Sequence, residues 1–172
     1  SSQRDGWSHL YLYDATTGQE VRQLTSGESN VARVLHLDEA GRWLYFTAMG
    51  REEGRDPYYQ HLYRVSLDGG EPELLTPDEA EHAICFSPSG RFFLDTYSTN
   101  DRPPMTELRT AAGALVRVVA QADISNLLAT GWRPPERFVA KSRDGVTDVY
   151  GLMLRPSTFD PDQRYPVIDY IY

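Results

Sequence analysis

The sequence has little basic charge, one cysteine and no long apolar run, and each shortage excludes a class of protein. Its 172 residues carry a net charge of −8 and a pI near 4.9. The basic residues are scattered, so a nucleic-acid surface, which needs a basic patch or stripe, is not expected. No run of about 18 apolar residues occurs, so no membrane contact is expected from this segment. The single cysteine, Cys85, cannot form an internal disulfide, and its apolar neighbours predict a buried structural thiol.

Metal and phosphate sites are not predicted either. No pair of histidines has the His-x-x-x-His spacing and no cysteine cluster lies near them, whereas zinc needs three or four converging ligands. A glycine-rich phosphate loop is also missing, so we expect no cofactor. The acidic pair Glu52-Glu53 lies between two predicted strands and is interpreted as a solvated loop between two blades. The four histidines are His9, His36, His61 and His82.

The sequence does contain an internal repeat of about fifty residues. Three short motifs occur twice, in the same order and at nearly constant spacing, which is the signature of a repeat architecture. The three pairs are His9–Asp14 with His61–Ser66, Gln23–Ser26 with Leu74–Pro77, and Leu37–Phe46 with Phe86–Asp95.

Each repeat predicts four short strands joined by glycine-containing turns. In the first unit the strands are expected at 9–14, 20–25, 31–37 and 42–48, with turns that end at Gly18 and Gly41. Four strands in about fifty residues are typical of a β-propeller blade, and a sandwich would not show this repeat. We therefore expect about two blades, with part of a third from Thr106 to Ala120. Because propellers have about 4–8 blades, the chain is interpreted as part of a longer protein.

The stretch Gly6-Trp7-Ser8-His9 looks like the start of a Gly-x-Ser-x-Gly nucleophile elbow. That motif needs a second glycine and a helix after the serine. Here Leu10 replaces the second glycine, and a predicted strand follows. The repeat also gives Ser8 a plain equivalent, Gln60. We therefore interpret Ser8 as a turn residue that leads into a strand.

The character of the sequence changes near residue 120. Residues 122–131 predict a short helix, with Asp123 as N-cap and Gly131 as its stop. A proline-rich linker follows. Three strand-like runs come next, at 136–142, 146–154 and 165–172, and Arg143–Gly145 forms the first hairpin turn. The last run predicts a central strand of a second domain, in a sheet whose partner strands are missing.

These features resemble the dipeptidyl peptidase IV branch of the prolyl oligopeptidase family, from Gln3 to Tyr172. The resemblance implies a mostly β chain: a partial β-propeller of about two to three four-stranded blades, a short helix, and the first antiparallel strands of an α/β-hydrolase domain. The corresponding domains are 1–121, 122–135 and 136–172. The matching pieces are Arg4–Tyr13, Tyr59–Gly70, His82–Gly90, Leu94–Ser98, Arg143–Gly145 and Arg164–Tyr172.

The resemblance also implies a function for the full-length protein. Members of this family are serine exopeptidases that release dipeptides from N-termini with proline or alanine in second position. The implied partners are peptide substrates and a second copy in a homodimer, and the implied location is periplasmic, extracellular or membrane-anchored. The alternative is a non-enzymatic propeller that only binds, but such a protein has no reason to carry the strands after residue 135.

Only one catalytic residue of the family is implied within this chain. The ending Tyr165-Pro-Val-Ile-Asp-Tyr-Ile-Tyr172 places Tyr172 at or next to the tyrosine that donates its hydroxyl to the oxyanion. The resemblance places the Ser-Asp-His triad beyond Tyr172, and the glutamate pair that binds the substrate amine before Ser1. Glu52-Glu53 falls in the wrong blade to be that pair. The chain alone is therefore expected to be inactive.

Overall fold

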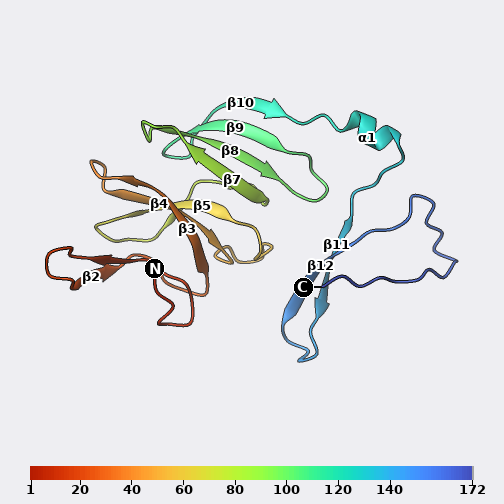
Figure 1. Cartoon of the computed structure of the whole chain (residues 1–172), viewed down its shortest axis with the longest axis horizontal. Coiled ribbons are helices and arrows are strands. Elements are labelled where there is room, and N and C mark those ends of the chain that lie inside the picture. The colour runs from red at the N-terminus through yellow and green to blue at the C-terminus, as the bar shows by residue number, and fades with distance from the viewer. Residues whose placement is uncertain (172) are drawn as a thin grey trace. The chain divides into compact units, whose positions relative to one another are not determined.

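The chain folds into two units that we describe separately. Figure 1 shows the computed structural model, which describes residues 1–171. The first unit comprises Ser1–Ala122, and the second begins at Asp123. Both are built mainly from antiparallel strands, as the aromatic and β-branched residues between glycine turns predict.

The first unit contains ten strands in three antiparallel sheets. The sheets are β1-β2, β3-β4-β5-β6 and β7-β8-β9-β10, and within each sheet consecutive strands are neighbours. The strands are β1 (Tyr11–Tyr13), β2 (Glu20–Gln23), β3 (Asn30–Asp38), β4 (Trp43–Met49), β5 (His61–Ser66), β6 (Glu73–Leu74), β7 (Glu81–Phe86), β8 (Phe92–Ser98), β9 (Met105–Thr110) and β10 (Leu115–Gln121).

The three sheets stack face to face around two apolar layers (Figure 1). Successive side chains of a strand point to opposite faces, so β4 serves both layers. Phe46 packs in the first layer with Leu10 and Leu24, which flank the β1-β2 hairpin. Tyr45 packs in the second layer with Phe93 of β8. The middle sheet is thus covered on both sides.

Equivalent buried hydrogen bonds confirm the predicted repeat. The Thr25 hydroxyl oxygen accepts a hydrogen bond from the Leu10 N–H at 3.0 Å. In the next sheet the Thr76 hydroxyl oxygen accepts one from the Leu62 N–H at 2.9 Å. Each bond satisfies a backbone donor that the fold removes from water, and this is why a threonine recurs at the same place in both motifs.

The sheets begin two strands later than predicted. We expected a blade to start at His9 and end with the strand at 42–48. Instead, hydrogen bonds join β4 to β5 across residues 50–60, with Ala48 opposite His61, while β2 and β3 lie in different sheets. A sequence period does not specify which strand comes first in the sheet, and only the strand pairing settles it.

The predicted partial third blade at Thr106–Ala120 is therefore also wrong. Strands β9 and β10 are the third and fourth strands of the sheet that begins with β7. Strands β1 and β2 form a sheet of their own. The first unit thus holds two four-stranded sheets and one two-stranded sheet.

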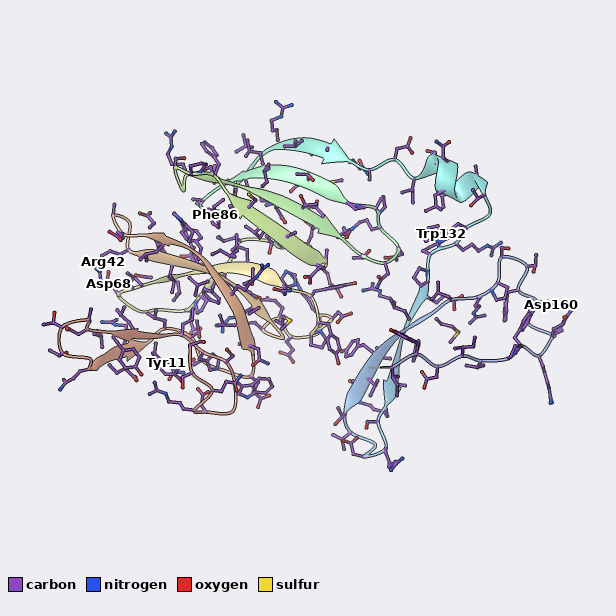
Figure 2. The ribbon with its side chains drawn as sticks, viewed as in Figure 1. Tyr11, Arg42, Asp68, Phe86, Trp132 and Asp160 are labelled. Atoms are coloured by element: carbon purple, nitrogen blue, oxygen red, sulfur yellow. The ribbon has the colours of Figure 1, made fainter. Side chains whose placement is uncertain are left out.

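The turn between β3 and β4 has an unusual backbone that an ion pair holds in place. Arg42 has a φ of 58°, a left-handed value that L side chains rarely adopt. Its guanidinium donates two hydrogen bonds to the Asp68 carboxylate, at 2.9 and 2.8 Å. Arg22 of β2 donates to the Asp68 carbonyl oxygen. Figure 2 shows Arg42 and Asp68 side by side at this edge. Asp68 therefore ties two turns of the middle sheet to strand β2 of the neighbouring sheet.

The second unit begins with the predicted short helix. Helix α1 spans Ser125–Ala129, and Gly131, at φ 83°, follows its end as predicted. The predicted N-cap was wrong, because Ile124 occupies that position and makes no side-chain cap. Asp123 lies one residue earlier, where its carboxylate accepts a hydrogen bond from the Ser125 N–H at 2.8 Å. It supports the first turn without being the cap.

The predicted hairpin of the second unit is also present. Strands β11 (Glu136–Lys141) and β12 (Asp148–Met153) pair antiparallel, from Glu136 opposite Met153 to Lys141 opposite Asp148. The Asp144 carboxylate closes the turn by accepting hydrogen bonds from two following N–H groups, both at 2.9 Å.

The predicted strand at 165–172 does not form within the described residues. Residues 165–171 have no ladder partner, and Val167 and Ile168 are 90% and 92% exposed. Strand composition alone does not make a strand, because the backbone groups also need a neighbouring strand to pair with. Tyr172 lies outside the described residues.

The Thr76 bond gives a direct test of the stacked-sheet arrangement. Replacing Thr76 with valine keeps the shape but leaves the Leu62 N–H buried without this acceptor. We expect the free energy of unfolding to fall by about 1–3 kcal/mol, as measured by urea denaturation. Thr76→Ser keeps the hydroxyl and should lose less. Equal losses for both variants would show that the hydroxyl bond does not stabilise the fold.

Candidate functional site

Ser8 connects backbone segments and has no catalytic surroundings. Its N–H donates to the Asn30 side-chain oxygen at 3.0 Å, and its carbonyl accepts from the Val31 N–H at 2.8 Å. The neighbouring imidazole of His9 is buried and faces away, because its two nitrogens contact the Thr25 hydroxyl at 3.1 Å and the Gly27 carbonyl at 2.9 Å. The interpretation of Ser8 as a residue between a turn and a strand is confirmed.

A crevice at the turn end of the first unit holds the three residue types of a serine-hydrolase triad, but they are not arranged as one. The crevice encloses about 590 Å³, and Ser89, His36 and Asp38 contribute to its lining. The Ser89 hydroxyl lies 3.2 Å from the Ser87 hydroxyl. The His36 ring stacks on Phe86 at 5.0 Å between centroids. Asp38 accepts from the Gly41 N–H at 2.9 Å. The hydroxyl, the imidazole and the carboxylate each contact a near neighbour and not one another, so no serine is activated as a nucleophile in this crevice.

The acidic pair Glu52-Glu53 lies in the β4-β5 loop, within one sheet and not between two blades as predicted. Glu52 accepts a hydrogen bond from the buried Tyr63 hydroxyl at 2.9 Å. Burial first, and this bond second, raise the pKa of Tyr63 well above its usual value. The exposed Glu53 points to solvent, so the two carboxylates do not act as a pair.

The prediction for Cys85 is wrong. Its thiol is exposed, because β7 alternates and Cys85 occupies the face of the sheet that points away from Ile84 and Phe86. Apolar neighbours in sequence do not bury a strand residue, since they lie on the opposite face. Among residues 1–171, no three His, Cys, Asp or Glu side chains are grouped to hold a metal ion.

The most strongly polar cluster in the interior was missed by the sequence reasoning. It joins β7, β8 and β9 and consists of one imidazole, two carboxylates, one guanidinium and one phenol. All five side chains are buried, with residue exposures of 0–8%. A signal for it was present, because Asp95 and Tyr97 alternate with Phe93 on the inward face of one strand. The five residues are His82, Asp95, Tyr97, Glu107 and Arg109.

Short contacts connect this cluster. His82 Nδ1 lies 2.8 Å from Asp95 Oδ1. The Arg109 guanidinium makes two contacts with Glu107 Oε2, at 3.0 and 2.6 Å, and its Nε lies 3.6 Å from Asp95 Oδ2. The Tyr97 hydroxyl donates to Glu107 at 3.2 Å. Burial and the nearby carboxylates raise the pKa of Tyr97 to about 12, so the phenol keeps its proton.

The oxyanion role implied for Tyr172 falls outside the described residues, and so its geometry is not described. In the part of the chain that the structure does describe, no helix is long and apolar enough to span a membrane. No candidate catalytic triad is assembled within residues 1–171, since Ser8 and Ser89 have no histidine partner.

Comparison with known proteins identifies the family. Residues 1–104 match the family described as "Dipeptidyl peptidase IV (DPP IV) N-terminal region". The match covers more than half of the chain, so the chain belongs to this family. The predicted resemblance and the mostly β, partial-propeller fold class are confirmed.

Individual relatives agree with this assignment. The chain is 28% identical to the probable dipeptidyl-aminopeptidase B of Emericella nidulans over 98% of its length, and 26% identical to dipeptidyl peptidase 4 of Trichophyton rubrum over 97%. It spans 19% and 21% of those two proteins. It therefore corresponds to about a fifth of the curated relatives that it matches.

Solved structures share the fold. The crystal structure of Porphyromonas gingivalis dipeptidyl peptidase 4 superposes on 96% of this chain with a TM-score of 0.77 at 22% identity. A putative dipeptidyl aminopeptidase IV from Bacteroides ovatus superposes on 96% with a TM-score of 0.75 at 27% identity. The chain covers 23% and 25% of these two structures.

The environment of His61 predicts a pH dependence of stability. His61 is 3% exposed, and burial lowers the pKa of its imidazole below the ordinary value of about 6.5. As the pH falls through 6.5, the unfolded chain binds a proton at this residue before the folded chain does. This difference destabilises the fold progressively as the pH falls.

Replacing His61 should remove its contribution to the pH dependence of stability. In urea unfolding between pH 7 and pH 5, His61→Gln should lose less stability than the unaltered protein over the same pH interval. His36→Gln makes the same chemical change at a partly exposed ring and serves as the control. If the pH dependence of His61→Gln equals that of the unaltered protein, His61 does not contribute to it.

Proposed function

We propose that this chain is a segment of a serine exopeptidase that releases dipeptides from peptides with proline or alanine in the second position. The observation that carries the proposal is the match of residues 1–104 to the dipeptidyl peptidase IV N-terminal region, in a chain whose relatives are dipeptidyl peptidases. The stacked four-stranded sheets and the hairpin that follows them support the same conclusion.

The domain assignment belongs to this proposal. Residues 1–121 form the C-terminal blades of a propeller, 122–135 a helix and proline-rich linker, and 136–172 the first strands of an α/β-hydrolase domain. The compact units Ser1–Ala122 and the one that begins at Asp123 support a boundary in this region. The propeller part acts as a substrate filter and as one wall of the active-site cavity.

In this proposal the bond chemistry depends on residues outside the chain. A serine nucleophile, a histidine base and an aspartate convert a peptide carbonyl into an acyl-enzyme, and water then releases the dipeptide. No such arrangement exists within residues 1–171. The full-length enzyme acts on peptides, forms a homodimer, and works in the periplasm, outside the cell or anchored to a membrane.

Tyr172 is the one residue of this chain proposed to take part in catalysis. A phenol O–H aimed at the developing oxyanion stabilises the tetrahedral intermediate more than the ground state. The support is the ending Tyr165-Pro-Val-Ile-Asp-Tyr-Ile-Tyr172, which resembles the segment of this family that contains the oxyanion tyrosine.

The first test compares the isolated chain with the full-length protein. A chromogenic Xaa-Pro substrate should be hydrolysed by the full-length protein and not by residues 1–172, because a lone oxyanion donor cannot turn over without a nucleophile and a base. Turnover by the purified chain would contradict the placement of the triad. No turnover by the full-length protein would contradict the peptidase assignment.

The second test concerns the role of Tyr172. In the full-length enzyme, Tyr172→Phe should lower kcat by about 10²–10³-fold with a much smaller change in KM, as loss of one oxyanion donor does. Tyr165→Phe is the control, because the Tyr165 hydroxyl serves locally as the acceptor for the Asp160 N–H at 2.9 Å. If both variants retain full kcat, Tyr172 is not the oxyanion donor.

A further inference from the structure

Three histidines are buried in the first unit, and their hydrogen-bond partners differ in one decisive respect. A neutral imidazole carries one N–H donor and one acceptor nitrogen, whereas an imidazolium carries two donors. The partners of the two ring nitrogens therefore report which form fits the site. The three residues are His9, His61 and His82, with exposures of 0%, 3% and 3%.

Two of these histidines fit the neutral form. The N–H of His9 can lie on Nε2, facing the Gly27 carbonyl, while its Nδ1 accepts from the Thr25 hydroxyl. His61 donates from Nδ1 to the Thr76 carbonyl at 3.1 Å. Its Nε2 has no hydrogen-bond partner, so no second acceptor requires a second proton there.

His82 differs because both of its nitrogens face acceptors. Nε2 lies 2.9 Å from the Asp78 carbonyl oxygen, which can only accept a hydrogen bond. Nδ1 lies 2.8 Å from Asp95 Oδ1, which also accepts when the carboxylate is ionised. A neutral ring has only one N–H, so its other nitrogen would face an acceptor oxygen at short distance with no proton between them.

The charge balance favours an imidazolium over a protonated Asp95. Without a proton on His82, the buried cluster contains two carboxylates, Asp95 and Glu107, and one guanidinium, Arg109, for a net charge of −1. One further positive charge at His82 makes the cluster neutral. Buried charges are tolerated when they are paired in this way. Asp95 Oδ2 has no hydrogen-bond partner, and the positively charged Arg109 Nε, 3.6 Å away, favours the ionised carboxylate through its charge alone.

Other groups packed around His82 are compatible with this charge. The His61 ring of β5 lies 5.2 Å away between centroids and fits the neutral form. The Tyr97 ring of β8 lies 5.3 Å away and keeps its proton. In the adjoining loops, Arg102 lies 3.4 Å from the Asp78 carboxylate, and this pair is partly exposed and neutral overall. None of these contacts places a second cation against the ring.

We propose that His82 is a built-in proton-binding site, at which the folded protein holds an imidazolium between Asp95 and the Asp78 carbonyl. With this proton the ring donates hydrogen bonds both to Asp95 of β8 and to the Asp78 carbonyl in the segment that precedes β7. These bonds lie next to the interface with the middle sheet. Alkaline pH consequently loosens the sheet that contains β7 and β8.

Nitrogen NMR of the histidine rings tests the protonation state directly. In the ¹⁵N-labelled full chain at pH 8, we expect both ring nitrogens of His82 to carry protons, and those of His9 and His61 to show the neutral pattern. His82→Gln identifies the signals of His82. A neutral His82 ring at pH 8 in the folded chain would overturn the proposal.

Equilibrium unfolding gives a second readout that does not depend on the first. Between pH 7 and pH 9, the unfolding equilibrium constant of the unaltered protein should rise by up to tenfold per pH unit from this one proton. His82→Gln should remove that rise, while His9→Gln, at an equally buried ring, should retain it. Equal pH dependence in the unaltered protein and His82→Gln would overturn the proposal.

If His82→Gln does not fold, Asp95→Asn replaces it in the unfolding comparison. The side-chain amide of this variant can donate an N–H to a neutral Nδ1 and lacks the negative charge that holds the proton, so the rise with pH should again disappear. If the isolated chain does not remain folded, the same variants are compared in the full-length protein. A rise that persists in Asp95→Asn contradicts the proposal in either setting.

Discussion

The fold of the first unit depends on covering both faces of its middle sheet. Strand β4 sends Phe46 to one apolar layer and Tyr45 to the other, so neither neighbouring sheet can be removed without exposing a large aromatic side chain. The stacked sheets also place polar groups in the interior. The buried threonine hydroxyls at positions 25 and 76 satisfy backbone N–H groups at these interfaces. Burial of the apolar side chains and hydrogen bonding of the buried N–H groups therefore favour the same arrangement of the three sheets.

Much of this architecture could be predicted from the sequence because its signals are local. Short aromatic runs, glycine turns and a repeated motif predict strands and hairpins, and Gly131 predicts the end of the helix. The order of strands within a sheet could not be predicted in the same way. Pairing between β4 and β5 crosses a loop of eleven residues, and nothing in the period distinguishes that link from the one between β2 and β3.

The remaining errors share a cause. Cys85 was predicted to be buried from its sequence neighbours, yet adjacent residues of a strand face opposite sides. Residues 165–171 have the composition of a central strand but no strand to pair with among the described residues. In both cases the outcome depends on what lies across the sheet. The local sequence does not contain that information.

For the candidate site, the sequence was most informative about which residues are not catalytic. The elbow-like Ser8 was correctly rejected because the repeat gave it a structural equivalent, and the structure shows that its backbone serves the fold. The cluster around Asp95 was missed because its members come from three strands and meet only after folding. Charged residues on the inward face of a strand are the pattern that would have revealed it.

The two-strand offset between repeat and sheet has a consequence for how such a chain can be cut or recombined. A genetic exchange that follows the repeat would end near Met49 and carry the β1-β2 sheet joined to only half of the middle sheet. Each product would then expose an unpaired strand edge to solvent and to other chains. A cut between β2 and β3, near Gly27, transfers whole sheets. The segment that repeats in the sequence and the segment that forms a whole sheet are therefore of similar length but begin and end at different residues.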